Sequence, residues 1–511
     1  MRSSSALAVL LLSIGCSVEN NSEQPATPDG SEAGSGGSTA GGTGGKSGGS
    51  AGSVGTGEGG GYSGPELGEL GPPTRLATGT TSIVGVTSDG WAIFREGEVL
   101  RAASVSDDSE VETVTEEPGS VLIKGRVVFN WADVDWEKNV GNLSIWSHEG
   151  GAQEIGATRY AENLIAANPE GTAIVYTANE SKGTTDLMIA TSDLESSEVL
   201  IESMGLGSET TCGPSLGFVG DRLLVGWCEK GKRDGQIQRF ALDDDEWTPT
   251  QIAENALPTW SADTSGDSIL YQSNAYEGFV SNDGDAVRID ASVSRGFLLP
   301  DGSAALYTVG DQLRRTSLPE PNPVPIVTTG YSEPVAFTSD YSFALYSSKV
   351  TYENGTQRDL RLVPTDGFSP EPIELVAEPT ATLPRSSLTK DGQFVLYLSD
   401  YTASGGHLHV VGTDGVEKTV LQDVLEAVAI GDSKIVYTAN ASDPEVYPVV
   451  SDLYVIDLAS SQPPTLIEAQ VLDGKNFQVV GEGERVVYLR SGVDRDVEDP
   501  ERDGMFYRTL P

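Results

Sequence analysis

The sequence predicts an all-β fold made of a repeated unit, preceded by a long segment that has no folded core. Two observations lead to this prediction. Beyond Pro72 the composition changes to short β-branched and aromatic runs separated by Asp-Gly, Asn and Ser turns. Within that region one pattern of turn, strand, loop and strand recurs. A single repeat domain can contain many copies of its unit, so a chain of 511 residues does not by itself require several domains.

The clearest copy of the repeat begins at Ile430. It has a turn, a strand ending at Tyr437, a second strand over Asp452–Asp457 with alternating faces, and a short third strand at Pro464–Ile467. Other clear copies begin at Asn168 and Thr389. The anchors of the ten units that we count are Phe94, Phe129, Tyr176, a weaker copy at Leu223–Gly226, Tyr271, Tyr307, Tyr346, Tyr397, Tyr437 and Tyr488.

The spacing of these anchors predicts a β-propeller over residues 72–511. Nine intervals separate Phe94 from Tyr488, which gives a period of about 44 residues, within the range of propeller blades. One four-stranded blade cannot cover both of its apolar faces, whereas blades stacked radially bury each other's faces and leave few open edges. We therefore expect the anchors to pack between blades.

The two ends of the repeat region predict how the ring closes. Pro72–Leu76 matches the outer-strand string Pro463–Ile467, and the last unit lacks an outer strand of its own. We expect the first strand to complete the last blade, which favours one ring. Ten blades exceed the usual four to eight, so two five-bladed rings are the alternative.

The repeat also resembles that of a known family. A Ser or Asp, an Asp-Gly turn, two variable positions, two aliphatic residues and a Tyr resemble the repeat of the TolB-like β-propellers, and Asp391–Tyr397 matches this string from the Asp-Gly turn onward. The resemblance covers roughly residues 72–511. It implies the fold and no single activity, because these propellers act as scaffolds, binders and accessory domains of enzymes.

The first residues predict export. Arg2 precedes an apolar run from Ala6 to Leu12, which is too short to span a bilayer and is typical of a signal peptide over residues 1–15. Its end at Cys16 resembles the bacterial lipobox, although Ser13 stands where that motif usually has Leu. The resemblance implies diacylglycerol on the Cys16 thiol, and Ser17 implies the outer membrane. A chance cysteine after an ordinary signal peptide is the alternative.

Residues 16–71 are dominated by Gly, Ser and Thr and predict a lipidated, disordered tether. A flexible chain of this length has an r.m.s. span of roughly 40 Å, so the folded domain would contact the membrane only through the lipid. Ala40–Ser47 looks like a phosphate-binding loop and Gly48–Gly52 like a hydrolase elbow. Both matches are attributed to chance, because neither has the flanking strand and helix that such motifs need.

Charge and cysteine content limit the partners and the compartment. The net charge of −44 disfavours nucleic acid and anionic lipid headgroups as partners. Cys212 and Cys228 form an even pair in an oxidising compartment, and a bridge closing a loop of about 15 residues would contribute roughly 3 kcal/mol. We predict this disulfide, with two free thiols as the alternative.

The sequence assigns no catalytic residue, metal site or cofactor. His407 and His409 share a strand face and could hold a metal ion with a third ligand, but polar residues on a blade face are the favoured interpretation. The acidic string from Asp494 departs from a calcium loop, with Asp499 where Gly is needed and Met505 where Glu is needed. A solvated hairpin is expected there. The three histidines of the chain support no Ser/His/Asp arrangement.

Two functions remain open. The first is a non-catalytic module on the cell envelope that binds or scaffolds an envelope protein or extracellular polymer through rim loops. The second is a lyase or hydrolase with a site in the central channel. Polar inserts over Asn130–Asn142, Ser347–Arg358 and Thr438–Ser451 favour binding, and the last carries Glu445, Tyr447 and Pro448.

Overall fold

In the computed structural model, the β-branched and aromatic runs beyond residue 72 form antiparallel strands joined by tight Gly, Asp and Asn turns. The structure describes residues 70–510, apart from 107–109, 160–163, 192–196, 206–213, 381–385, 443–448, 473–476, most of 491–502 and single or paired positions between them. These residues lie in one compact unit, Gly64–Pro511. Within the described part, no helix is long and apolar enough to cross a membrane.

The described strands make ten four-stranded blades, numbered here in chain order. Blade 1 contains β2 (Thr80–Val86), β3 (Trp91–Glu96), β4 (Val99–Ser104) and β5 (Val111–Thr115). Blade 2 contains β6 (Ser120–Lys124), β7 (Val127–Asp135), β8 (Val140–Ser147) and β9 (Gly151–Arg159). Blade 3 contains β10 (Ala166–Ala167), β11 (Ala173–Ser181), β12 (Thr184–Thr191) and β13 (Ser197–Gly205).

Blades 4 and 5 share one long strand, β17 (Glu246–Ala262). Its first part, up to Ala256, pairs with β16, and its last part, from Ala256, pairs with β18. Blade 4 begins with β14 (Ser215–Val219), β15 (Arg222–Cys228) and β16 (Gly235–Asp243). Blade 5 continues with β18 (Ser268–Ser273), β19 (Gly278–Asn282) and β20 (Asp285–Asp290).

The next two blades are separate sheets. Blade 6 contains β21 (Arg295–Leu298), β22 (Ala304–Val309), β23 (Gln312–Ser317) and β24 (Val324–Val327). Blade 7 contains β25 (Tyr331–Phe337), β26 (Phe343–Tyr352), β27 (Gly355–Pro364) and β28 (Ile373–Thr380).

Blades 8 and 9 share β32 (Glu417–Ile430), which pairs with β31 up to Val424 and with β33 from Val424 onward. Blade 8 begins with β29 (Ser386–Leu388), β30 (Phe394–Thr402) and β31 (Gly405–Gly412), and blade 9 continues with β33 (Lys434–Ala439), β34 (Val450–Asp457) and β35 (Thr465–Leu472). Blade 10 contains β36 (Phe477–Val480), β37 (Arg485–Arg490), β40 (Gly504–Thr509) and β1 (Thr74–Ala77). The short pair β38 (Val493–Asp494) and β39 (Val497–Glu498) lies between β37 and β40 in the chain.

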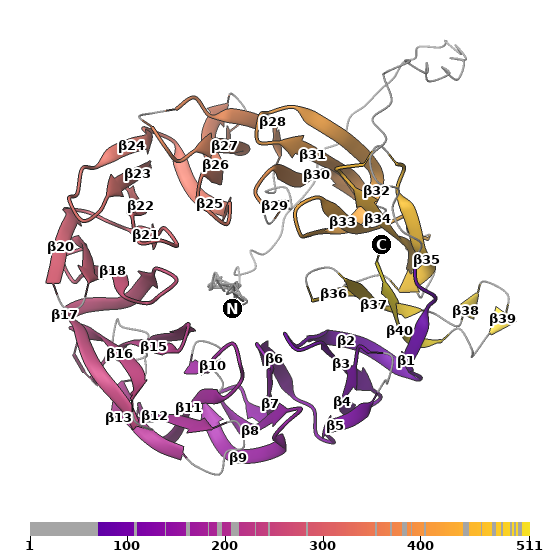
Figure 1. Cartoon of the computed structure of the whole chain (residues 1–511), viewed down its shortest axis with the longest axis horizontal. Helices are drawn as coiled ribbons and strands as arrows, with labels where there is room; N and C mark the ends of the chain where they lie inside the picture. The colour runs from indigo at the N-terminus through magenta and orange to yellow at the C-terminus, as the bar shows by residue number, and fades with distance from the viewer. Residues whose placement is uncertain are drawn as a thin grey trace, which may run out of the picture. The chain divides into compact units, whose positions relative to one another are not determined.

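The first strand of the chain completes the last blade, as expected from the sequence. Thr74 pairs with Tyr507 and Arg75 with Phe506, so β1 lies against β40. Figure 1 shows the blades following one another around a circle, with the first strand of each near the centre and the last at the outside. Val487 and Met505 of blade 10 pack against Phe94 of blade 1.

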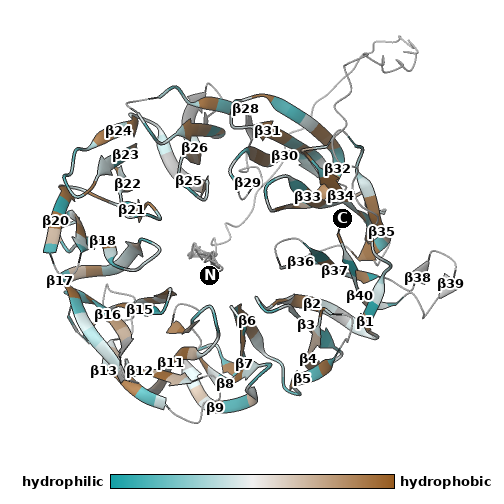
Figure 2. Cartoon of the chain, in the orientation of Figure 1, coloured by the Kyte–Doolittle hydropathy of each residue, from teal (hydrophilic) through white to brown (hydrophobic). Residues whose placement is uncertain are grey.

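The apolar core lies between consecutive blades. Tyr307 of blade 6 packs with Leu270 of blade 5 in one buried cluster, so packing continues across the point where two five-bladed rings would separate. Each of the ten expected anchors lies on the second strand of its blade, which confirms the repeat count. Outer strands such as β9 and β28 carry hydrophilic stretches (Figure 2). The chain is thus an all-β propeller of four-stranded blades.

Candidate functional site

The connection between the second and third strands of each blade defines one rim of the propeller, called here the hairpin rim. Every blade starts with its innermost strand and alternates strand direction outward, so these connections all emerge on the same side. The turns between first and second strands emerge on the opposite side, called here the turn rim. The two rims can therefore be compared as surfaces.

The exposed aromatic side chains of the described residues all lie on the hairpin rim. Trp136 of blade 2 is 63% exposed, Tyr276 of blade 5 is 59% exposed, and Tyr401 of blade 8 is 47% exposed. Exposed single aliphatic residues need no explanation, but large aromatic side chains are enriched where proteins bind partners. The hairpin rim is therefore the candidate binding surface.

Trp136 lies at the tip of an extended hairpin. Strands β7 and β8 are long for this chain and continue to Asp135 and from Val140. Asp133 and Asn139 adopt left-handed φ values of 50° and 54°, which short polar side chains tolerate. The backbone N–H of Glu137 donates to Asp135 Oδ1 at 3.1 Å. The tip therefore has a defined turn with a carboxylate on each side of the indole.

Tyr276 is held in an unusual backbone conformation. Its φ is 63°, which is costly for a bulky residue and persists only where the surroundings enforce it. Its N–H donates to the Ser273 carbonyl at 2.8 Å, and its carbonyl accepts from the Val293 N–H at 2.7 Å. Next to it, the Glu277 carboxylate pairs with Arg288 at 2.8 Å. These contacts orient a strained tyrosine outward on the rim.

Tyr401 follows a β-bulge. The pairing of β30 with β31 is irregular between Ser399 and Thr402, and Asp400 has a φ of 49°. Bulges redirect side chains and occur often beside functional sites. Asp400 Oδ2 lies 3.6 Å from His407 Nδ1 on the paired strand. Each of the three exposed aromatic residues therefore has a carboxylate next to it in the chain.

The exposed aromatic residues occur on blades 2, 5 and 8, so they are spread around the ring and not gathered in one patch. A small ligand could contact only one of them. A partner that covers the mouth of the ring, or a polymer that runs across it, could contact several at once.

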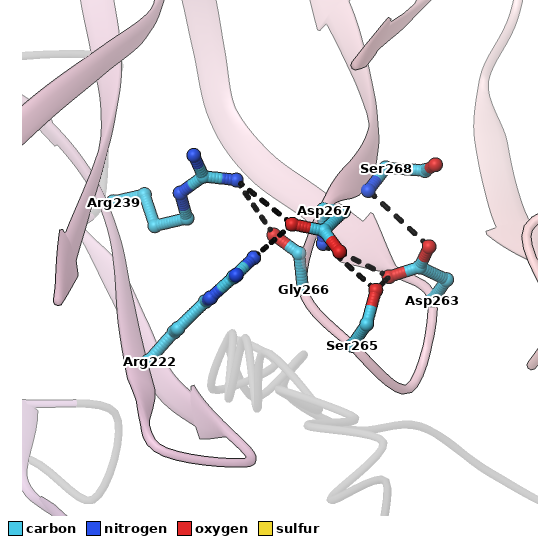
Figure 3. Close-up of polar contacts among 7 residues, drawn as sticks. All are labelled: Arg222, Arg239, Asp263, Ser265, Gly266, Asp267 and Ser268. Carbon is cyan, nitrogen blue, oxygen red and sulfur yellow. Dashed lines mark hydrogen bonds and ion pairs between the residues drawn. The ribbon is translucent and has the colours of Figure 1, made fainter. Parts of the chain in front are cut away.

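On the turn rim, one cluster of charged side chains links blade 4 to blade 5 (Figure 3). Arg222 and Arg239 of blade 4 both point at Asp267 in the first turn of blade 5, and Arg239 Nη1 also donates to the Gly266 carbonyl at 3.2 Å. Asp263 Oδ2 accepts the Ser268 N–H at 3.3 Å. The hydrogen bond from Arg222 is the main cause that holds the pKa of Asp267 below its usual value.

A second turn of this rim shows the same use of aspartate. The N–H of Ser303 donates to Asp301 Oδ1 at 3.0 Å, and this hydrogen bond is the main cause that lowers the pKa of Asp301. The Asp-Gly turns of the repeat therefore have structural roles on this rim.

The innermost strands face the central channel, where the enzyme hypothesis places its site. In the sequence of these described strands, the charged residues are Lys124, Arg295, Glu333 and Glu426, which belong to blades 2, 6, 7 and 9. The rest of these strands consists of small, apolar and uncharged polar residues.

The structure places some of the sequence-predicted site residues and leaves others outside its range. Cys16 and Cys212 lie outside the described residues. Cys228 is buried at the end of β15 and is disulfide-bonded. Its pairing with Cys212 stays a prediction.

His407 and His409 lie on the same strand, as expected, but each contacts a different carboxylate. His407 faces Asp400, and His409 faces Glu417 at 3.1 Å. No group of three metal-ligating side chains occurs among the described residues. Asp494 lies in β38, which pairs with β39 as the expected hairpin, whereas Asp499 lies outside the described part.

The three inserts named from the sequence all belong to the hairpin rim, but two of them are mainly strand. Asn130–Asn142 is occupied by the extended ends of β7 and β8, and Ser347–Arg358 by β26 and β27. The prediction of loops was wrong for these two ranges, because antiparallel pairing continues through polar residues once a hairpin register is set. In Thr438–Ser451, residues 443–448, with Glu445, Tyr447 and Pro448, lie outside the described part.

Tyr276 and Tyr401 lie outside these three ranges. Their sequence signal was an aromatic residue beside an acid at the point where a second strand ends.

Comparisons with known proteins give structural similarity only. No family model matches the chain, and no curated relative matches it. A structure of a eukaryotic initiation factor superposes at a TM-score of 0.43 with 8% identity, covering 78% of this chain and 91% of that one.

Two further similar structures are known propeller proteins. TolB from Acinetobacter baumannii gives a TM-score of 0.28 with 15% identity, covering 55% of this chain and 76% of that one. The WD40 domain of SCAP from fission yeast gives 0.35 with 10% identity, covering 67% and 96%. These TM-scores are below 0.5, so the fold assignment rests on the strand pairing and blade packing of this chain itself.

Proposed function

We propose that this chain is a lipid-anchored binding module of the bacterial outer membrane, which holds an envelope protein or extracellular polymer on its hairpin rim. The observation that carries the proposal is the placement of Trp136, Tyr276 and Tyr401. These exposed aromatic side chains all lie on one rim, whereas on the other rim Asp267 is paired with two arginines of the neighbouring blade.

The chemistry of the three tips suits contact without a deep pocket. Indole and phenol rings supply large contact area with few rotatable bonds, and the neighbouring carboxylates add directional polar contacts. Because the tips are spread over blades 2, 5 and 8, a wide partner would gain from several weak contacts at once.

The binding proposal is tested by removing the three rings together. The triple variant Trp136→Ala, Tyr276→Ala, Tyr401→Ala should lose partner capture in crosslinking of intact envelopes. The matched control is the double variant Val111→Ala, Leu466→Ala. It removes exposed aliphatic side chains from the outer strands β5 and β35, away from the hairpin rim, and it should leave partner capture unchanged. Capture that survives the triple variant, at equal thermal stability, would contradict the proposed surface.

The location is tested separately through Cys16. Cys16→Ser should prevent lipidation, so that the protein is released from membranes into the soluble fraction. Fractionation and intact-mass measurement check this result. Equal membrane retention of the wild type and the variant would refute the anchor while leaving the rim proposal standing.

The alternative function is a lyase or hydrolase with its site in the central channel. It would require groups on the inner strands to converge on a substrate. Turnover of a polysaccharide or peptide library that is abolished by Arg295→Ala or Lys124→Ala, and unaffected by the rim variants, would favour that alternative.

A further inference from the structure

Blade 8 brings a serine, a histidine and a glutamate from three neighbouring strands into contact. Ser399 lies on β30, His409 on β31 and Glu417 on β32. Ser399 Oγ is 2.9 Å from His409 Nε2, and His409 Nδ1 is 3.1 Å from Glu417 Oε2. Both distances are within hydrogen-bonding range, so the three side chains form one continuous chain.

The glutamate determines which imidazole nitrogen carries the proton. An ionised carboxylate can only accept hydrogen bonds, so the nitrogen facing Glu417 must be Nδ1–H in the neutral ring. His409 Nε2 then presents a lone pair, which accepts a hydrogen bond from the Ser399 hydroxyl. This order of nucleophile, base and orienting carboxylate is the one that activates serine in acyl-transfer enzymes.

The imidazole is also fixed by packing. The ring of His409 stacks on Tyr397 with centroids 4.7 Å apart and an interplanar angle of 6°. Tyr397 is itself buried, and its hydroxyl donates to the Leu375 carbonyl of blade 7 at 2.9 Å. The His409 side chain is only 19% exposed. A ring held in this way loses little freedom when it acts as a base.

Ser399 remains partly exposed and lies at the start of the bulge that carries Tyr401. Its hydroxyl has one competing acceptor, Asp400 Oδ2, at the longer distance of 3.4 Å. The other nearby histidine, His407, faces Asp400. The contact of Ser399 with His409 is therefore shorter than its contact with Asp400. Tyr401 provides an apolar surface on the same hairpin.

We propose that Ser399 is a nucleophile for carboxylic esters, with His409 as its general base and Glu417 as a positioning residue. The Ser399 Oγ forms a bond to the acyl carbon while its proton moves to His409 Nε2. The ester C–O bond breaks, and the departing alcohol takes that proton. Water then attacks the acyl-serine with the same base, which releases the acid and restores the serine. No cofactor is needed, and the activity would be additional to binding on the rim.

A fluorophosphonate probe tests the nucleophile directly, because serine attack on phosphorus expels fluoride and leaves a stable adduct. Intact-mass measurement and peptide mapping of the full chain should find one adduct, on Ser399. Ser399→Ala should abolish it, and His409→Gln should slow labelling by about 100-fold or more. The matched control is Ser433→Ala, whose Oγ bonds Asp457 at 2.8 Å, and it should label like the wild type.

The role of Glu417 has its own readout. In Glu417→Gln the side-chain amide no longer requires a proton on Nδ1, so the nitrogen-15 NMR signature of His409 should shift away from the Nδ1–H tautomer. Labelling should slow while the melting temperature stays near that of the wild type. A burst of nitrophenolate from p-nitrophenyl acetate, close to one per protein, should disappear in Ser399→Ala.

Three outcomes would overturn the inference: no adduct on the folded wild type, an adduct that persists in Ser399→Ala, or a labelling rate unchanged by His409→Gln. Each is independent of partner capture, so failure here does not affect the binding proposal, and failure of capture does not affect this site.

Discussion

At the scale of single residues, the repeat tyrosines join one blade to the previous one. The hydroxyl of Tyr307 donates to Asp290 at 3.0 Å, and that of Tyr488 donates to Glu468 at 3.0 Å. Both acceptors lie on the outer strand of the preceding blade, as does the Leu375 carbonyl that accepts from Tyr397. Burial is the main cause that raises the pKa of Tyr307 and Tyr488.

Burial also raises the pKa of Tyr437 to about 12, from 10.0. Below pH 10 both folded and unfolded chains keep this proton. Between pH 10 and 12 the unfolded chain loses it first, so the free energy of unfolding should fall by about 3 kcal/mol from this group. Urea unfolding at a series of alkaline pH values should show a shallower decline in Tyr437→Phe. Parallel curves for both proteins would contradict this assignment.

Gly226 is a second residue whose identity is set by packing. A Cβ there would lie 2.0 Å from the Pro258 carbonyl oxygen on β17 of the next blade, a contact that only backbone movement could relieve. Gly226→Ala should destabilise the protein by about 3 kcal/mol or more. Gly220 has a φ of 56° and open space around it, so Gly220→Ala should cost only about 1 kcal/mol. Thermal unfolding compares the two variants. Equal losses of stability would show that the backbone moves enough to relieve the contact between a Cβ at position 226 and the Pro258 carbonyl.

At the scale of elements, the hairpins and shared strands are what the repeat pattern describes least well. β17 and β32 each serve as the outer strand of one blade and the inner strand of the next, with an irregular register where they pass between sheets. Extended hairpins such as β26–β27 continue pairing into polar sequence. Both features depend on the partner strand, which local composition does not specify.

The ion pairs of Arg222 and Arg239 with Asp267 link blade 4 to blade 5. The pKa of Asp267 is lower in the folded chain than in the unfolded chain. Its contribution to the free energy of unfolding is therefore present above the pKa of the unfolded chain, and it is lost as the pH falls through the pKa of the folded chain. Its carboxylate is 42% exposed, so Asp267→Asn should cost at most about 1 kcal/mol, and less at high salt. Melting temperatures at low and high salt check this, and a large salt-independent loss would contradict it.

At the scale of the whole molecule, each blade depends on its neighbours, and blade 10 depends on the other end of the chain. Pairing of β1 with β40 covers an edge that would otherwise present unpaired backbone groups. This contact joins positions more than 400 residues apart in a chain of 511.

Removal of β1 tests that dependence. A chain starting at Gly79 should melt at a lower temperature than one starting at Pro73, and it should associate through the exposed edge of β40. Size-exclusion chromatography and thermal unfolding compare the two. Identical melting temperatures and monomeric behaviour would show that the first strand contributes little.

The sequence by itself determined the all-β class, the ten anchors, the period and the match between the first strand and the last blade. These features are local: alternation sets which face of a strand is apolar, and the spacing of turns sets the unit. Only the tertiary structure decided that Trp136, Tyr276 and Tyr401 lie on the same rim, and that Ser399 and Glu417 lie on either side of His409. The sequence supported no Ser/His/Asp arrangement, because strand register and rotamers decide whether such side chains meet.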